Sequence, residues 1–269
     1  MAVKSPIPWN GAKTRGCKIL ASHLPPHIDK MVSIFIGGAS FELYCEDVLR
    51  LNVTNAYDNF QPLITFWQQV RSKETAAKMV EIVAEMAKNG FGRERYTQLK
   101  DKYNRHIRNQ EIIENDFDLA CLFYFCHKFS FSSTPMFYSY SPTKDNERGI
   151  KNALKALYDF HTAIDFECAD FTVSMEKHNN DFLYLDPPYY IDGEKLKREC
   201  YVGHKKFDHV KFAECVKNHK GQFMLSYGDC EFVRDTYKDY KMIELKWPYS
   251  MRNMNARTIE PYELLIMNY

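Results

Sequence analysis

Residues 181–190 read Asp-Phe-Leu-Tyr-Leu-Asp-Pro-Pro-Tyr-Tyr, and this stretch decides how the chain is organised. Its apolar start, up to Leu185, is typical of a short buried strand. Pro187 and Pro188 lack a backbone N–H group and have a fixed φ angle, so the strand must end at Asp186. Because ligands bind at the carboxyl ends of the strands in an open α/β sheet, we expect Asp186 to face a ligand.

The Asp-Pro-Pro-Tyr turn offers the groups that a flat ring with an amino substituent requires. Asp186 and the carbonyl of Pro187 can accept the amino hydrogens, Pro188 keeps the turn stiff, and the ring of Tyr189 can stack on the ligand. The alternative is a solvated acid before an ordinary Pro-Pro turn. This tetrapeptide should occur by chance in roughly one in a thousand chains of this length, so we favour the ligand site.

The composition is that of a globular protein with one or two domains, since 45% of its 269 residues are hydrophobic and 15% are aromatic. The 36 basic and 35 acidic residues nearly cancel, so affinity for nucleic acid has to come from local basic patches. The eight cysteines include no C-x-x-C pair, which argues against a zinc site and favours the reduced thiols of a cytosolic protein. No apolar run suggests export or membrane insertion.

A glycine turn follows the first predicted strand, which spans residues 31–36. Gly37-Gly38-Ala39-Ser40 lets the backbone approach a ligand closely, and a helix starting near Phe41 aims its N-terminus at the same place. The turn is not G-x-G-x-x-G, so the fingerprint of dinucleotide-binding proteins is not met.

Two further acids follow predicted strands. A strand over 53–56 precedes Asp58 and Asn59, about twenty residues after the glycine turn, where a carboxylate binds ribose hydroxyls in nucleotide-binding α/β folds. An ordinary Asp-Asn turn explains these residues equally well. A strand over 163–168 precedes Asp170. The remaining predicted strands are 182–185, 223–227, 241–247 and 263–267.

The N-terminal loop, residues 7–15, contains Trp9, Gly11 and Lys13. It can close over an anionic or carboxylate-bearing ligand, with Trp9 packed on that ligand. Taken alone, an ordinary turn with solvated cations is the preferred interpretation.

The alternation of strands and helices stops between residues 61 and 158, where apolar residues at helical spacing predict a helical core. These residues are Phe66, Val70, Met79, Ile82, Val83 and Met86. From Lys88 to Arg108 there are seven cations and two acids, interleaved with aromatic residues. Such a patch can contact the phosphates of nucleic acid, although most charged runs are solvated faces. The candidate DNA-binding residues are Arg93, Arg95, Lys100, Lys128, Ser132, Lys197 and Arg198.

Seven motifs together give the chain a family resemblance that covers nearly its whole length. They are PWNGAK (8–13), FIGGAS (35–40), YDN (57–59), CADF (168–171), YLDPPY (184–189), LSYGD (225–229) and ELLIMN (263–268). In this order the chain resembles the Dam-type (D12 class) DNA adenine N6-methyltransferases. The resemblance implies an α/β fold with a Rossmann-like methyltransferase sheet, residues 1–59 and 155–269, and an inserted, mainly helical DNA-recognition domain, residues 60–154.

The resemblance also implies that S-adenosyl-L-methionine is the methyl donor, that S-adenosyl-L-homocysteine is the product, and that no metal is required. Asp58 would bind the ribose of the donor and Asp170 its adenine amino group. The catalytic residues would be Asp186, Pro187, Pro188 and Tyr189. The donor-binding residues would be Trp9, Gly11, Lys13, Phe35, Gly37, Gly38, Ala39, Ser40, Asp58, Asn59, Asp170, Phe171 and Asp186.

The substrate that the resemblance implies is double-stranded DNA with the target adenine flipped out of the helix. We expect a site-specific enzyme of the restriction-modification type, a monomer or weak dimer, in the cytoplasm of a bacterium or of a virus-infected host cell. Transfer to cytosine amino groups or to RNA is an alternative, as is a catalytically silent DNA-binding member of the fold.

Two departures from the family pattern limit what can be carried over. The family commonly has Glu-Pro before its F-x-G-G turn, whereas this chain has Ser33-Ile34, so the ammonium group of the donor has to be held differently. The N-R-x-x-F-N-G segment of the helical insertion is replaced by residues 127–133, so the DNA sequence that the enzyme recognises cannot be inferred.

Overall fold

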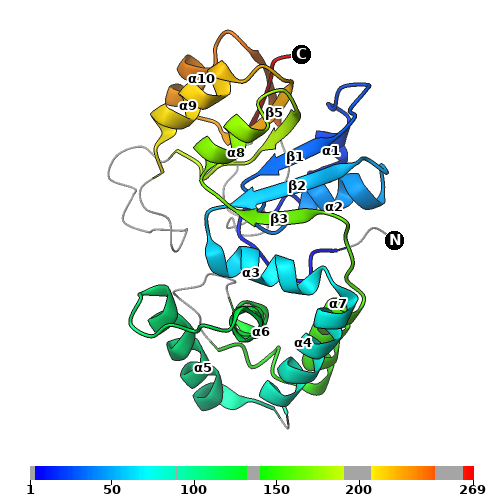
Figure 1. Cartoon of the computed structure of the whole chain (residues 1–269), viewed down its shortest axis with the longest axis vertical. Coiled ribbons are helices and arrows are strands. Elements are labelled where there is room, and N and C mark those ends of the chain that lie inside the picture. Colours follow the sequence, from blue (N-terminus) through cyan, green and yellow to red (C-terminus); the bar gives the residue numbers. More distant parts are fainter. Residues whose placement is uncertain (1–3, 89, 132–139, 191–206, 246–262) are drawn as a thin grey trace, which may run out of the picture.

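The computed structural model describes residues 4–88, 90–131, 140–190, 207–245 and 263–269. These residues form a mixed α/β protein around one seven-stranded sheet of order β3-β2-β1-β4-β5-β7-β6 (Figure 1). The five neighbouring strands β3, β2, β1, β4 and β5 are parallel, while β7 is antiparallel to both of its neighbours, β5 and β6. The strands are β1 (Met31–Ile34), β2 (Val53–Asp58), β3 (Asp165–Cys168), β4 (Phe182–Leu185), β5 (Phe223–Gly228), β6 (Lys241–Leu245) and β7 (Glu263–Met267).

Helices cover both faces of the sheet, and each face has its own hydrophobic core. Alternate residues of β4 explain this, because Phe182 and Tyr184 belong to one core and Leu183 and Leu185 to the other. The second core is closed by α8, α9 and α10. The helices are α1 (Cys17–Ala21), α2 (Ser40–Asp47), α3 (Gln61–Val70), α4 (Lys73–Met86), α5 (Gly92–Ile107), α6 (Asp116–Phe129), α7 (Glu147–Tyr158), α8 (Phe171–Lys177), α9 (His209–Asn218) and α10 (Glu231–Thr236).

The five helices from α3 to α7 occupy the predicted helical region and lie together on one side of the sheet (Figure 1). Helix α3 packs against β2, β3 and α6 and so connects the sheet to the rest of this group. The core on this side is continuous, since it includes Met31 and Tyr184 of the sheet together with Tyr103 and Phe123 of the helices.

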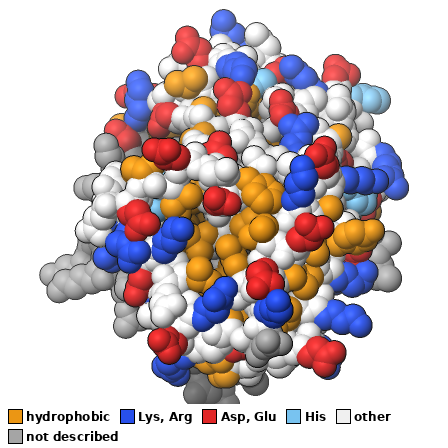
Figure 2. Space-filling model, turned by 60° about the horizontal axis from the view of Figure 1, so that its bottom comes forward, with side chains coloured by type: hydrophobic (Ala, Val, Ile, Leu, Met, Phe, Trp, Pro, Cys, Tyr) orange, Lys and Arg blue, Asp and Glu red, His pale blue; other side chains and the backbone are white. Residues whose placement is uncertain are grey.

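The end of the molecule formed by α4 and α7 has a groove lined by Val80, Ala84, Ile150 and Leu154. Figure 2 shows hydrophobic side chains gathered in a hollow at this end, with charged side chains of both signs around them. The predicted core position Ile82 of α4 is 40% exposed, because Met79 and Val83 define the buried face of the helix. That prediction was wrong.

Strand β1 ends two residues earlier than predicted. Phe35 adopts a φ of +73° and Gly37 a φ of +45°, so the chain leaves the extended conformation directly after Ile34. Strands β4 and β7 have the predicted bounds. No helix in the described part of the chain is both long enough and apolar enough to span a membrane.

Candidate active site

The carboxyl ends of four neighbouring parallel strands bring the predicted acids and the glycine turn to one edge of the sheet. Asp170 follows β3, Asp58 ends β2, the turn at Gly37 follows β1, and Asp186 follows β4. The chain passes from β1 outward to β2 and β3 and then returns to β4 on the other side of β1. Such a switch point is where open α/β sheets bind ligands.

Trp9 packs directly over the glycine turn. A Cβ atom at Gly37 would lie 2.7 Å from Trp9 Nε1, and one at Gly38 would lie 2.7 Å from Trp9 Cβ. The φ of Gly37 is +45°, a conformation that disfavours any other residue. The Trp9 ring also stacks on His127 of α6, with ring centroids 5.5 Å apart. The N-terminal loop is therefore held between the sheet and the helical group.

Asp58 fastens the glycine turn to the end of β2. Its Oδ2 accepts a hydrogen bond from the N–H of Gly37 at 3.3 Å, and its Oδ1 accepts one from the N–H of Phe60 at 3.1 Å. The residue is only 8% exposed. Asp58 thus has a structural role, and its predicted contact with a ribose stays a prediction.

Lys13 and Asp186 form a buried ion pair. Lys13 Nζ donates to both carboxylate oxygens of Asp186 at 2.6 Å and to the carbonyl of Gly11 at 3.2 Å. The Lys13 side chain is 3% exposed and that of Asp186 is 20% exposed. Lys13 is one of the predicted donor-binding residues, and its ammonium group lies on the acid of the Asp-Pro-Pro-Tyr turn.

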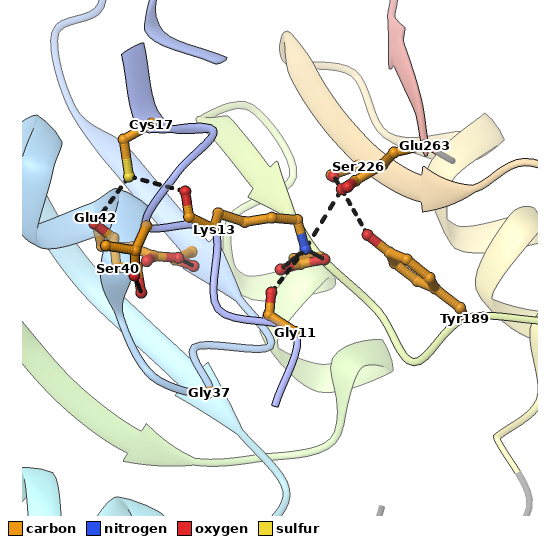
Figure 3. Close-up of polar contacts among 12 residues, drawn as sticks. Gly11, Lys13, Cys17, Gly37, Ser40, Glu42, Tyr189, Ser226 and Glu263 are labelled. Carbon is orange, nitrogen blue, oxygen red and sulfur yellow. Dashed lines mark hydrogen bonds and ion pairs between the residues drawn. The ribbon is translucent and has the colours of Figure 1, made fainter. Parts of the chain in front are cut away.

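Glu263 connects this ion pair to Tyr189. Its Oε1 accepts hydrogen bonds from the Tyr189 phenol at 2.5 Å and from the hydroxyl of Ser226, and it lies 3.4 Å from Lys13 Nζ (Figure 3). The Tyr189 ring covers Gly228, where a Cβ atom would lie 2.9 Å from the ring. Lys13 Nζ is 5.2 Å from the centroid of the same ring. The Lys13 ammonium therefore contacts both the carboxylate and the aromatic ring that were predicted to hold the substrate.

Burial raises the pKa of the Asp186 carboxyl to about 6, while the charge and hydrogen bond of Lys13 lower this pKa and the charge of Glu263 raises it. Removing a carboxylate from water disfavours its charged form, and a nearby cation restores part of the loss. Asp186 is therefore mainly ionised at neutral pH, and its oxygens can accept hydrogen bonds.

Trp9, the glycine turn, Lys13, Asp58, Asp186 and Tyr189 line one pocket, with about 650 Å³ of empty space when the open solvent at its mouth is included. The predicted site residues that line this pocket are Trp9, Gly11, Lys13, Phe35, Gly37, Gly38, Ala39, Ser40, Asp58, Asp186, Pro187, Pro188 and Tyr189.

Three predicted donor-binding residues do not line this pocket. Asn59 is exposed at the end of β2. Asp170 caps the N-terminus of α8, where its carboxylate accepts hydrogen bonds from the N–H and the hydroxyl of Thr172 at 2.9 and 2.7 Å. Phe171 packs against Phe35 with ring centroids 6.1 Å apart. The contact predicted between Asp170 and the donor adenine stays a prediction.

The candidate DNA-binding residues of α5 are partly engaged within the protein. Arg95 donates to the carbonyl of Met86 at 2.9 Å, and the Arg93 guanidinium lies 5.7 Å from the centroid of the Tyr140 ring. Lys100 is 3.9 Å from its neighbour Asp101. Ser132, Lys197 and Arg198 lie outside the described residues.

Lys128 lines a separate pocket together with Lys144 and Arg148, and no acid is among the described residues that line it. Lys128 donates to the carbonyl of Pro6 at 2.6 Å, and Lys144 donates to that of Ser130 at 2.6 Å. Burial, together with the charge of Lys144, lowers the pKa of Lys128 to about 8. Burial also lowers the pKa of Lys144. We call this the cation pocket.

Glu42 and Glu263 belong to the site but were not predicted. Glu42 lines the active-site pocket, and its position three residues before the buried Cys45 on α2 was a signal that it faces inward. Glu263 begins an apolar strand, and nothing in the sequence pairs it with Tyr189. Among the residues that the structure describes, no group of three or more His, Cys, Asp or Glu side chains is placed to hold a metal ion.

A mostly parallel sheet, a glycine turn after β1 and the Asp186 site after β4 together have the form of an α/β methyltransferase. Residues 9–251 match the model of the D12 class N6 adenine-specific DNA methyltransferases, and the chain belongs to that family. It is therefore an enzyme that methylates adenine in DNA. The resemblance stated from the seven motifs is confirmed.

Two relatives show how the match extends along the chain. The type II methyltransferase M.CviBI of Paramecium bursaria Chlorella virus NC1A is 22% identical over 289 residues, which cover 99% of this chain and 100% of the relative. The modification methylase StsI of Streptococcus sanguinis is 23% identical over 300 residues, which cover 99% of this chain but 43% of that relative.

Proposed function

We propose that this enzyme transfers the methyl group of S-adenosyl-L-methionine to the amino group of an adenine flipped out of duplex DNA at a specific site. One observation carries the proposal. The Asp186 carboxylate, the stiff turn of Pro187 and Pro188, and the anchored ring of Tyr189 share a pocket with the glycine turn after β1.

The backbone and the charge of the pocket lining suit S-adenosyl-L-methionine. Trp9 leaves no room for side chains on Gly37 and Gly38, so a ligand there meets bare backbone. The described lining residues include the acids Glu42, Asp58 and Asp186 and one lysine, Lys13, and an acidic lining favours a cationic ligand. When bound, the donor supplies a methyl group on a positively charged sulfur, which is activated for displacement.

Positioning accounts for most of the chemistry that the protein residues perform. The lone pair of an adenine amino nitrogen is delocalised into the ring, so the nitrogen is a poor nucleophile. Asp186 accepts one amino hydrogen and the carbonyl of Pro187 accepts the other, which directs the lone pair of the nitrogen toward the methyl group. Holding the reacting atoms about 3 Å apart and in line makes the transfer effectively unimolecular.

The ammonium group of Lys13 has to move away from part of Asp186 before the substrate base can bind. Its ammonium engages both oxygens of Asp186 and lies over the Tyr189 ring, where the base would be hydrogen-bonded and stacked. The base can accept this place only when the ammonium releases at least one oxygen. Until then Lys13 offsets the charge of a largely buried acid.

We further propose that residues 60–154 form the DNA-recognition part of the protein and that DNA phosphates bind in the cation pocket. Lys128 and Lys144 are partly buried and each donates a hydrogen bond to a neutral backbone carbonyl, so an anion would stabilise both ammonium groups. Pro8 lines the cation pocket and Trp9 lines the active-site pocket. DNA in the cation pocket would therefore lie beside the loop that covers the glycine turn.

The test compares Asp186→Ala with Asp229→Ala, a matched change after the neighbouring strand β5 at a residue outside the pocket. We expect Asp186→Ala to bind S-adenosyl-L-homocysteine nearly as the wild type does but to methylate DNA about 10²–10³-fold more slowly, because a contact with the reacting nitrogen is lost. The measurements are calorimetric binding and transfer of labelled methyl groups to mixed-sequence duplex DNA. Retained turnover in Asp186→Ala would refute the role of this acid.

The same assay separates the alternatives. Nucleoside analysis of the product should find N6-methyladenine in duplex DNA and no methylated cytosine or RNA. DNA binding with no transfer by the wild type would favour the catalytically silent alternative.

A further inference from the structure

Glu42 is a buried acid in the active-site pocket that the proposed chemistry does not use. It is the third residue of α2, is 3% exposed and lines the same pocket as Asp186. Its Oε1 accepts a hydrogen bond of 2.5 Å from the hydroxyl of Ser33 on β1. In the view of Figure 3, Glu42 and Glu263 lie on opposite sides of the Lys13 ammonium.

No lysine, arginine or histidine of the described residues forms an ion pair with Glu42. Lys13, the cation of the same pocket, donates to both oxygens of Asp186 and lies 3.4 Å from Glu263. The other groups that sense the charge of Glu42 include the thiols of Cys17 and Cys45, whose pKa values it raises. Glu42 is therefore a largely desolvated acid that has no ion pair among the described residues, although the charge of Lys13 in the same pocket lowers its pKa.

An acid in this setting is unfavourable unless something compensates its charge. Burial raises the pKa of Glu42 to about 7, and the hydrogen bond from Ser33 only partly opposes this rise. At neutral pH the side chain is thus divided between its neutral and charged forms. A cation entering the pocket would favour the charged form and would gain a strong, desolvated ion pair.

We propose that Glu42 binds the ammonium group at the amino-acid end of S-adenosyl-L-methionine. This inference depends on the proposed function. The donor has two cationic groups, the sulfonium and the ammonium. The sulfonium has to lie near Asp186 and Tyr189, because its methyl group must reach a nitrogen held there. The ammonium remains for Glu42, while the carboxylate of the donor would be repelled by this acid.

The geometry explains how a departure from the family sequence pattern can be tolerated. Ser33 stands where the family commonly has glutamate. Its hydroxyl donates the hydrogen bond that holds the Glu42 carboxylate in place. A carboxylate contributed by α2 would then take the place of one contributed by β1. The pair would keep an acid at this wall of the pocket although the residue on β1 is neutral.

The test measures calorimetric binding of two ligands to Glu42→Gln. S-Adenosyl-L-homocysteine has the amino-acid end, whereas 5′-methylthioadenosine has the nucleoside and thioether but lacks that end. We expect the dissociation constant of S-adenosyl-L-homocysteine to rise about 10- to 100-fold and that of 5′-methylthioadenosine to stay within about 2-fold. Glutamine keeps an oxygen for the hydroxyl of Ser33 and carries no charge, so the variant should fold.

Glu46→Gln is the matched control on the same helix. The Glu46 carboxylate accepts hydrogen bonds from the hydroxyl of Thr162 and the N–H of Ala163, and the residue does not line the pocket. It should leave both affinities unchanged. In the wild type, affinity for S-adenosyl-L-homocysteine should also fall as pH drops below about 7 and Glu42 becomes protonated, and Glu42→Gln should lose this dependence.

Equal weakening of both ligands in Glu42→Gln, or no weakening of either, would overturn the assignment of Glu42 and leave the proposed function intact. A wild type that binds neither ligand would instead refute the donor site as a whole.

Discussion

Lys13 has two opposing effects on the residue that we propose to be catalytic. Its charge lowers the pKa of Asp186 and so keeps the carboxylate ionised in a largely buried place. Its ammonium also covers the oxygens that the base has to reach. The same contact therefore prepares the acid and blocks it, and exchange of Lys13 for the base is an expected step of substrate binding.

The pH dependence of the reaction should report this pair. Asp186 carries a negative charge and two acceptor oxygens only when it is deprotonated, so kcat/KM of the wild type should fall as pH drops below about 6. In Lys13→Met the cation that lowers the pKa of Asp186 is absent, and the midpoint of this fall should move to higher pH. The measurement is kcat/KM for DNA at a saturating concentration of the methyl donor. The pH is varied from about 5 to about 9, because such side chains titrate in roughly this range.

Lys13→Arg retains the charge and should keep the midpoint near that of the wild type. Lys18→Met, at an exposed position of α1, is the control for loss of a nearby lysine. An unchanged or lower midpoint in Lys13→Met would show that Lys13 does not set the ionisation of Asp186.

The connection from β1 to α2 requires glycine, because a side chain on Gly37 or Gly38 would meet Trp9. Gly37 has a φ of +45° and Gly92 a φ of +63°, but only Gly37 lies under Trp9, and nothing lies within 4 Å of a Cβ at Gly92. The two glycines therefore share a left-handed backbone, which is strained for any other residue, but only Gly37 contacts the wall of the pocket. This difference allows the two effects to be measured separately.

Gly92→Ala should destabilise the fold by about 1 kcal/mol, because alanine disfavours a left-handed backbone, and Gly37→Ala should destabilise it by more, because its Cβ also meets Trp9. Only Gly37→Ala should also weaken binding of S-adenosyl-L-homocysteine, by about 10-fold or more, because its Cβ displaces Trp9 at the pocket wall. Chemical denaturation and calorimetry measure the two effects. Normal ligand binding by Gly37→Ala would place the donor elsewhere.

The predicted strands and helices agree with the structure where local chemistry decides them. Pro187 and Pro188 end β4 at Leu185, as expected from the missing N–H groups. The end of β1 was missed, because the positive φ of Phe35 is imposed by the tertiary structure and leaves no mark in the sequence.

The partners within the site could not be predicted in the same way. Thirteen predicted residues line one pocket, because glycine turns and acids after parallel strands meet at one edge of a sheet. The contacts of Lys13 with Asp186 and of Tyr189 with Glu263 join residues 173 and 74 positions apart. Pairings of this kind depend on strand order, which hydrophobic periodicity does not specify.

The two basic regions of the molecule differ in the contacts and the burial of their cations. The cations of α5 have partners on the protein or are exposed, whereas the cation pocket holds two half-buried lysines with lowered pKa values. Phosphate contacts release counterions, so they are visible in the salt dependence of DNA affinity.

Lys144→Met should weaken binding to duplex DNA of any sequence and reduce the slope of log K against log[salt] by about 1. Lys78→Met is the control, since Lys78 is exposed and paired with Glu74 on α4. Fluorescence anisotropy at several salt concentrations measures both variants. An unchanged slope in Lys144→Met would exclude a phosphate from the cation pocket.

Strand β7 follows β6 in sequence but is inserted between β5 and β6, and its first residue is the acceptor for Tyr189. During synthesis on the ribosome, β1, β2, β4 and β5 can therefore assemble while the phenol of Tyr189 still lacks that acceptor. A nascent chain that has not yet released residues 263–267 from the exit tunnel would carry the Asp-Pro-Pro-Tyr turn in an unanchored form. Anchoring of the Tyr189 ring would thus be a late event in the biogenesis of this enzyme.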